Sequence, residues 1–233
     1  MIGTLTYGAD TVPYEVCFLS SRRTLAIEVF PDCRVLVRAP LGCSNALIAE
    51  RVQKRAPWIA RQIAEFEGYR PRTPARQYIN GESHLYLGRQ YRLKISTGSA
   101  AAVKLTRGQF LVTLPEARDP EQVRWILERW YLDRARTLFA EVLIDKLSLF
   151  EGIEQPRLIV RAMQTRWGSL SNAGAMTLNT SLIRAPRTCI EYVVVHELCH
   201  VRNRNHDARF FRELRRVMPD WERRKQRLES ALL

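Results

Sequence analysis

The sequence predicts an α+β fold, in which a mostly β N-terminal half with an inserted helix precedes a half with a long helix, a short antiparallel sheet and three further helices. Apolar residues recur at every second position in several short N-terminal segments, which is the period of a strand. They recur at helical spacing after residue 119, and the period of two returns between residues 157 and 180. We therefore expect two domains, residues 1–118 and residues 119–233.

The N-terminal half contains strand patterns that are interrupted once by a helical pattern. Strands are predicted within residues 12–40, where a Pro-Asp-Cys turn separates two of them. A helical pattern follows from Ser44 to about Glu67, and Pro57 is expected to kink it or to divide it in two. The remaining predicted features are a linker over residues 68–74, a hairpin from His84 to Ile95 about Gly88, and a hairpin from Val103 to Leu114 about Arg107-Gly108.

The C-terminal half begins with a strong helix signal. Asp119 can cap a helix with Pro120 at its first position, and apolar residues continue at helical spacing to about Leu149. Two strands follow, with a loop or hairpin turn between them, and Thr188 with Glu191 forms a capping box for the next helix. The other predicted elements are strands at 158–161 and 175–180, and helices at 206–217 and 221–232.

The composition is that of a globular protein with a basic surface. The chain has 233 residues, of which 46% are hydrophobic and 26% charged, and no internal repeat is apparent. The N-terminus lacks a basic region followed by an apolar core, and no apolar run approaches the roughly 18 residues that cross a membrane. We therefore expect a cytoplasmic protein with no membrane partner. The five cysteines form no zinc-knuckle pattern, which predicts reduced thiols, and the oligomeric state is left open.

Three of the four histidines lie close together in the sequence, at positions 196, 200 and 206. His196 and His200 are one helical turn apart, so both side chains project from one face and can share an ion. Glu197 completes an H-E-x-x-H pattern, in which two imidazoles bind zinc and the carboxylate accepts a proton from the attacking water. The apolar neighbours predict a buried helix, where unpartnered polar groups would be costly. This segment predicts one Zn²⁺ per chain, and the rival interpretation is a hydrogen-bonded polar seam without metal.

The spacing favours His206 as the third ligand. Two asparagines, one of them Asn203, lie between His200 and His206, and asparagine tolerates the left-handed backbone that commonly ends a helix. The chain could therefore turn back toward the same ion. The alternative ligand is Glu213, in which case His206 would only begin the next helix. Three protein ligands leave a position open for chemistry, whereas ligation by Cys199 would make the site structural.

Several motifs around this helix occur together in a known family. They are Arg166-Trp167-Gly168-Ser169, the Leu178-Asn179 step, the helix from Tyr192 to His200, and Asn205-His206 followed by Phe210. In these residues the chain resembles the YgjP-like family of bacterial zinc metallopeptidases, which is related more distantly to the SprT-like proteases. The resemblance is sharpest over about residues 155–221. It implies a zincin-like C-terminal half with His196, His200 and His206 as zinc ligands and Glu197 as the general base.

The motif and the resemblance together predict a zinc-dependent hydrolase, most simply a metallopeptidase acting on a peptide or protein. The strand around residues 175–180 could hold such a substrate by strand addition. The candidate substrate-binding residues are Arg161, Arg166, Trp167 and Asn179.

Two other functions stay open. Arg161 and Arg166 could grip phosphate oxygens in bidentate fashion, which would make the protein a nucleotide pyrophosphohydrolase. The net charge of +13 could also attract a nucleic acid, with the zinc site serving a structural role. Charge alone supports this weakly, because the densest basic stretch, residues 202–227, also contains carboxylates and is in part a solvated helix face.

Overall fold

The computed structural model describes residues 2–8, 10–30, 32–68, 76–115 and 119–232. The chain divides into two compact units, residues 1–73 and residues 74–232. The division therefore differs from the predicted boundary at residue 118, because the second sheet packs on the long helix that follows it. Most of the predicted linker at 68–74 lies outside the described residues.

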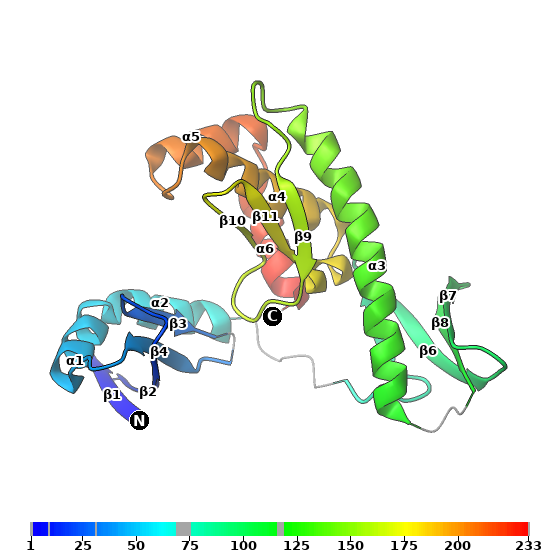
Figure 1. Cartoon of the computed structure of the whole chain (residues 1–233), viewed down its shortest axis with the longest axis horizontal. Helices are drawn as coiled ribbons and strands as arrows, with labels where there is room; N and C mark the ends of the chain where they lie inside the picture. Colours follow the sequence, from blue (N-terminus) through cyan, green and yellow to red (C-terminus); the bar gives the residue numbers. More distant parts are fainter. Residues whose placement is uncertain (1, 9, 31, 69–75, 116–118, 233) are drawn as a thin grey trace. The chain divides into compact units, whose positions relative to one another are not determined.

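The first unit is a four-stranded sheet followed by two helices (Figure 1). The strand order is β1-β2-β4-β3; β2 pairs with β4 in parallel, and the two outer pairs are antiparallel. Strand β1 was not predicted. The helical pattern is divided at Arg55, so that Pro57 lies in the first turn of the second helix, where its missing N–H costs little. The elements are β1 (Ile2–Tyr7), β2 (Asp10–Leu19), β3 (Ala26–Val29), β4 (Val35–Pro40), α1 (Asn45–Lys54) and α2 (Ala56–Glu67).

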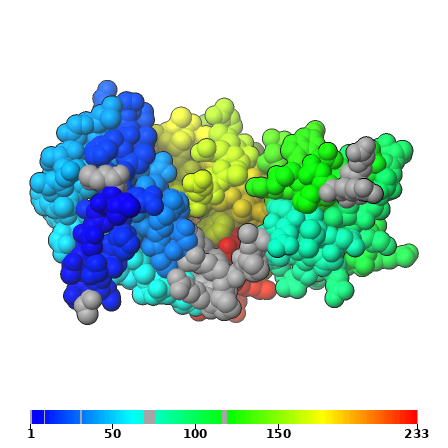
Figure 2. All heavy atoms as spheres, turned by 90° about the horizontal axis from the view of Figure 1, so that it is seen from below, coloured from blue at the N-terminus to red at the C-terminus, as the bar shows by residue number. Residues whose placement is uncertain are grey.

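Alternation along the strands builds the core of the first unit. Val35, Val37 and Ala39 of β4 are buried, and they pack with Ile48 of α1 and Ile59 of α2. Removing such side chains from water drives the sheet and helices together. Figure 2 shows the strands (dark blue) and the helices (lighter blue to cyan) packed into one body.

The second unit begins with a sheet of the same topology as the first. Its order is β5-β6-β8-β7, again with a central parallel pair and two outer antiparallel pairs. Buried positions correspond as well: Val112 of β8 matches Val37 of β4, and Asp119 caps the next helix as Ser44 caps α1. Both predicted hairpins are confirmed. The strands are β5 (Ser83–Tyr86), β6 (Arg89–Thr97), β7 (Ala102–Thr106) and β8 (Gln109–Leu114).

Helix α3 (Pro120–Leu147) joins this sheet to the remainder of the unit, and the predicted long helix is confirmed. The Asp119 side chain accepts a hydrogen bond from the Glu121 N–H at 2.9 Å, which satisfies one of the unpaired donors of the first turn. Tyr131 is fully buried, and its hydroxyl donates to the Leu85 carbonyl at 2.7 Å. Helix α3 thereby packs on the second sheet with one part of its surface and contacts α4 with another.

A three-stranded sheet and three helices complete the second unit. The strand order is β10-β11-β9; β10 pairs antiparallel with β11, whereas β9 pairs parallel with it. The predicted antiparallel sheet is therefore mixed, and β10 occupies the stretch where a loop or turn was expected. The elements are β9 (Arg157–Arg161), β10 (Gly168–Leu170), β11 (Ala175–Asn179), a short 3₁₀ turn η1 (Thr180–Arg184), α4 (Arg187–Arg202), α5 (Ala208–Val217) and α6 (Trp221–Leu232).

Helix α4 does not begin with the predicted capping box. Its N-cap is Pro186, which offers no side-chain cap, and the buried Thr188 hydroxyl has no hydrogen-bond partner among the described residues. Glu191 instead accepts a hydrogen bond from Arg224 of α6 at 2.7 Å. A partly buried ion pair between two helices has therefore replaced the local cap.

Two further observations concern the described chain in general. No helix among the described residues is both long enough and apolar enough to span a membrane. The structure joins none of the five cysteines, all of which are described, in a disulfide.

Candidate metal centre

Three imidazoles converge at the end of helix α4. His196 and His200 project from one side of α4, and His206 lies in the segment between α4 and α5. The Nε2 atom of His206 is 3.0 Å from Nε2 of His196 and 3.1 Å from Nε2 of His200. These three residues form a group whose ligand atoms all lie within 4.8 Å of one another.

The donor set fits a tetrahedral divalent metal ion. The Nδ1 atom of His200 lies 2.9 Å from the Asn203 carbonyl oxygen, which can only accept, so the ring proton is on Nδ1 and Nε2 carries a lone pair. Two lone pairs at this distance repel each other unless a proton or a metal cation lies between them. Nitrogen ligands on tetrahedral zinc are about 3.3–3.4 Å apart, given metal–nitrogen distances of about 2.0–2.1 Å. The observed spacing is close to that value.

Burial favours the neutral form, which a metal needs, at His196 and His206. Burial, followed by the neighbouring His200 and His206, lowers the pKa of His196 to about 3. Burial and the neighbouring His200 also lower the pKa of His206. A metal ion therefore does not have to displace a proton from His196 near neutral pH.

Phe210 of α5 forms a platform under the cluster. Its ring centroid lies 4.9 Å from that of His196, and 4.7 Å from those of His200 and His206. The Asp207 side chain caps α5 by accepting from the N–H groups of Arg209 and Phe210, which places Phe210 in the first helical turn. His206 is thereby held just before the helix rather than within it.

The turn between α4 and α5 is closed by side-chain bonds and not by a left-handed residue. Asn203 has φ −126° and ψ 96°, which is extended backbone, so the expected left-handed turn there is wrong. Its side-chain amide donates to Glu213, and Arg202 pairs with the same carboxylate at 3.2 Å. Glu213 therefore holds the turn, and it does not belong to the histidine group.

Glu197 is buried beside the cluster on the same helix. Its side chain is 5% exposed, and burial raises its pKa to about 7, although the Arg166 guanidinium and a hydrogen bond from the Leu170 N–H act in the opposite direction. One carboxylate oxygen, Oε2, has no hydrogen-bond partner among the described residues. The Glu197 carboxylate therefore has one buried oxygen, Oε2, that remains available to accept a proton or a hydrogen bond.

Gly168 makes room for this carboxylate. A Cβ atom at residue 168 would lie 2.7 Å from Oε1 and 2.9 Å from Cγ of Glu197, closer than carbon atoms approach. A side chain at this position of β10 would therefore force the Glu197 carboxylate to move from its place beside the strand. The glycine of the Arg-Trp-Gly-Ser segment therefore leaves the space that the side chain of Glu197, the candidate base, occupies.

A cavity of about 660 Å³ opens over the histidines and Glu197. One wall is β10, the edge strand of its sheet, and the register turns the backbone groups of Gly168 and Leu170 away from β11. The Leu170 N–H donates to Glu197, and both Gly168 and Leu170 line the cavity. Further charged residues around the cavity are Arg166, Arg204, Lys225 and Glu229.

An apolar hollow of about 440 Å³ adjoins the same cluster. The Trp221 ring stacks with Phe211 at a centroid distance of 5.5 Å and with Tyr192 at 6.4 Å, and these three rings form its aromatic wall. His196 and His206 form part of its lining, so the hollow begins directly beside the candidate metal position. Its lining can accept an apolar group of about side-chain size.

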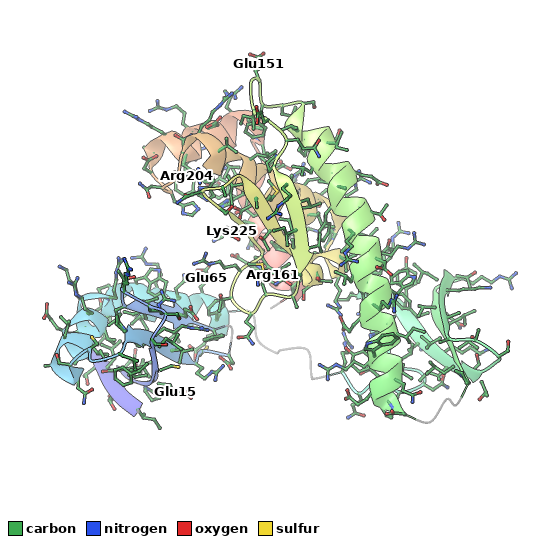
Figure 3. The ribbon with its side chains drawn as sticks, viewed as in Figure 1. Glu15, Glu65, Glu151, Arg161, Arg204 and Lys225 are labelled. Atoms are coloured by element: carbon green, nitrogen blue, oxygen red, sulfur yellow. The ribbon has the colours of Figure 1, made fainter. Side chains whose placement is uncertain are left out.

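The four predicted substrate residues divide into two pairs. Arg166 and Trp167 line the cavity, as expected. Arg161, labelled in Figure 3 at the end of β9, is exposed and outside this lining. Asn179 is 3% exposed, and its amide donates to the carbonyls of Met163 and Arg166 at 2.8 and 3.0 Å. Asn179 is therefore not a substrate contact; it holds the loop that presents Arg166.

One other expectation about the site is corrected, and one alternative is excluded. Strand β11 is the central strand, hydrogen-bonded on both sides, so it cannot accept an added substrate strand, whereas β10 is an edge strand. Cys199 is buried, and burial raises the pKa of its thiol to about 12. It is outside the histidine group, so the alternative in which its thiolate closes the metal site does not fit.

Sequence reasoning missed Tyr192 as a residue of the site. It is four residues before His196 on α4, so the helical period that pairs His196 with His200 also places Tyr192 on this face. Its side chain lines both the cavity and the apolar hollow. Burial, followed by Glu229 and Glu197, raises the pKa of its hydroxyl, which therefore remains protonated at neutral pH.

Comparison with known proteins agrees with this geometry. The model of a family described as YgjP-like, metallopeptidase domain, matches residues 23–231. The chain belongs to the YgjP-like family. It is accordingly a metal-dependent peptidase, and the resemblance inferred from the sequence motifs is confirmed. Membership in the YgjP-like family also implies a divalent metal.

Two solved structures are similar over part of the chain. They are the metallopeptidase zymogens of Methanocaldococcus jannaschii jannalysin and Pyrococcus abyssi abylysin, which are 21% and 22% identical to it, each with a TM-score of 0.35. The alignments cover 39% and 38% of this chain, and 92% and 87% of the other two. A comparison with curated proteins finds no match.

The close approach at Gly168 leads to a testable prediction. We expect Gly168→Ala to slow peptide hydrolysis about a hundredfold, because the new Cβ displaces the Glu197 carboxylate from its position. Hydrolysis of a quenched fluorescent peptide library measures the rate, and mass spectrometry should find an unchanged metal content. Ser169→Ala, at the next position of β10, is the control and should slow the reaction far less. Full activity in Gly168→Ala would show that β10 does not position Glu197.

Proposed function

We propose that the protein is a zinc-dependent metallopeptidase in which His196, His200 and His206 hold one zinc ion and Glu197 is the general base. The observation that carries this proposal is the convergence of three Nε2 atoms directly beside a buried carboxylate. Three nitrogen ligands favour zinc over the hard cations, which prefer oxygen, and leave a coordination position for chemistry. Family membership supports the peptidase part of the proposal.

Different residues of the chain have different roles in the proposed hydrolysis. The chemistry that a zinc ion supplies in such a site is Lewis acidity toward water and toward a carbonyl oxygen. Glu197 accepts the proton of the attacking water, for which a pKa raised to about 7 suits it, and returns the proton to the leaving amine. Phe210 and the Asn203 carbonyl hold the imidazoles in place during these steps.

An extended peptide along β10 brings the scissile bond over the metal centre. The outward backbone groups of Gly168 and Leu170 border the cavity that contains Glu197 and the three histidines. Main-chain hydrogen bonds to such an edge position a peptide regardless of its sequence. Sequence preference then comes from the aromatic hollow, whose wall of Tyr192, Phe211 and Trp221 favours a large apolar side chain next to the scissile bond.

The two alternative functions have less support. A phosphate grip by Arg161 and Arg166 requires both side chains at the cavity, and Arg161 is not among its lining residues. A purely structural zinc site requires a fourth protein ligand, and the described residues near the cluster supply three. Nucleoside triphosphates therefore serve as a negative control in the assays below.

Metal binding provides the first test. The protein purified without a histidine tag or added metal should contain about one zinc per chain by mass spectrometry. Loss of a residue that hydrogen-bonds to a metal ligand lowers metal affinity roughly 10- to 100-fold. Because His206 is itself a proposed ligand, His206→Ala should lower zinc affinity by more than that. The matched control is His84→Gln, because His84 lies in β5 and is outside the group. Equal zinc content in wild type and His206→Ala would contradict the three-histidine site.

The role of the carboxylate provides the second test. Glu197→Gln preserves the shape of the side chain and removes the proton acceptor, so we expect peptide hydrolysis to fall by about 10²- to 10⁴-fold. Zinc content should stay at the wild-type level, which distinguishes loss of the base from loss of the metal. Retained turnover with zinc bound would exclude this role. Phosphate release from nucleoside triphosphates should be absent in both proteins.

Cleavage preference provides the third test. Wild-type protein should cleave a mixed peptide library beside large apolar residues, and mass spectrometry of the products would identify the sites. Trp221→Ala enlarges the hollow, so the preference should shift toward bulkier aromatic residues. Trp125→Ala removes an indole that is 62% exposed on α3 and should leave the preference unchanged. An unaltered profile in Trp221→Ala would mean that this hollow does not receive the substrate.

A further inference from the structure

The first unit contains a groove of about 960 Å³. All residues of this groove belong to the first unit, and none belongs to the metal centre. It lies between strand β3 and the surfaces of α1 and α2. The lining residues are Arg23, Thr24, Leu25, Ala26, Ile27, Pro40, Cys43, Leu47, Arg51, Lys54, Arg55 and Trp58.

The charge of the groove has one sign. Among the described lining residues four are cationic, Arg23, Arg51, Lys54 and Arg55, and none is acidic. None of these four forms an ion pair within the part of the chain that the structure describes. By contrast Arg38 of β4, in the same unit, is neutralised by Glu28 of β3 at 3.1 Å. Four neighbouring cations without counterions attract an anionic partner.

The groove also has an edge strand and an apolar floor. Strand β3 ends the sheet order β1-β2-β4-β3, so one of its two edges is unpaired among the described strands. The hydrogen bond from the Phe30 N–H to the Arg34 carbonyl sets the alternation, which turns the backbone of Leu25 and Ile27 away from β4. Leu47, which is 43% exposed, and Trp58 provide apolar surface beside this edge.

The second sheet shows that the fold does not require this basic groove. In the matching topology α1 corresponds to the start of α3, with Ser44 equivalent to Asp119, so that Arg51 and Arg55 correspond to Ile126 and Trp130. Ile126 is buried, and Trp130 packs against Phe110 at a centroid distance of 5.1 Å. The same scaffold thus places apolar residues at two positions where the first unit has exposed cations.

We propose that this groove binds an extended acidic peptide segment, which adds as a strand to β3. Its backbone pairs with Leu25 and Ile27, its carboxylates meet the four cations, and its apolar side chains lie against Leu47 and Trp58. A nucleic acid fits less well, because a phosphodiester chain has no ladder of N–H and C=O groups to pair with the edge. The proposal goes beyond the peptidase function and does not depend on it.

Binding of a defined probe tests the proposal. The probe is a short fluorescein-labelled peptide of alternating Glu and Val, measured by fluorescence anisotropy at low salt. The protein is the full chain with Glu197→Gln, so that the probe stays intact. Arg51→Glu combined with Lys54→Glu should weaken binding about tenfold or more, since each reversal replaces an attraction by a repulsion. Arg61→Glu, at an exposed position of α2 outside the groove, should leave binding unchanged.

Three comparisons can overturn the proposal. The same peptide with alternate backbone nitrogens methylated should bind at least about tenfold more weakly, and equal binding would exclude strand addition. An oligothymidylate that binds more tightly than the peptide, and is lost with the same charge reversals, would replace the peptide by a nucleic acid. Absence of binding in the parent protein would refute the site. Leu47→Asp provides a second variant if the double reversal lowers the Tm.

Discussion

Helix α4 carries two imidazoles and a carboxylate to the margin of an apolar core, and the protein around it satisfies only some of their polar atoms. A buried polar group without a partner costs roughly 2–7 kcal/mol, so each of these side chains needs a specific neighbour. The Asn203 carbonyl accepts a hydrogen bond from His200, Phe210 covers the three rings, and Gly168 leaves space for Glu197. The Nδ1 atom of His196 and Oε2 of Glu197 have no hydrogen-bond partner among the described residues. The α4–α5 turn and β10, which supply two of these neighbours, also line the cavity together with α4 and α6.

The sequence predicts the metal centre better than its surroundings, because the centre depends mostly on local geometry. One helical turn fixes the relation of His196 to His200, whatever the rest of the chain does. The position of His206 needed only a short turn. The start of α4 was mispredicted because Glu191 bonds to Arg224, which is distant in sequence and replaces the local cap. Strand β10 was missed because its residues are half-buried and show no alternation.

The residues that carry the family resemblance do not all have the same role. Trp167 lines the cavity, and Gly168 positions the carboxylate, but Asn179 only holds the loop between β9 and β10. A motif read from sequence cannot separate these roles, since a residue that supports a loop is as specific in type as one that touches a substrate. Arg161 shows the opposite case: its residue type suits binding of a substrate, but its position in the strand register places it outside the cavity.

The two four-stranded sheets show which part of a fold the sequence must preserve. Their strand orders and pairing directions agree, and the buried alternation of β4 is repeated in β8, because a one-residue slip would turn the apolar face outward. Outside these buried positions few residues are the same in the two sheets, so their structural similarity is not apparent in the sequence. Two equivalent helix positions differ in kind, since Arg51 and Arg55 of the first unit correspond to Ile126 and Trp130 in α3. Because the same topology forms with either choice, the fold itself does not require cations at these two positions.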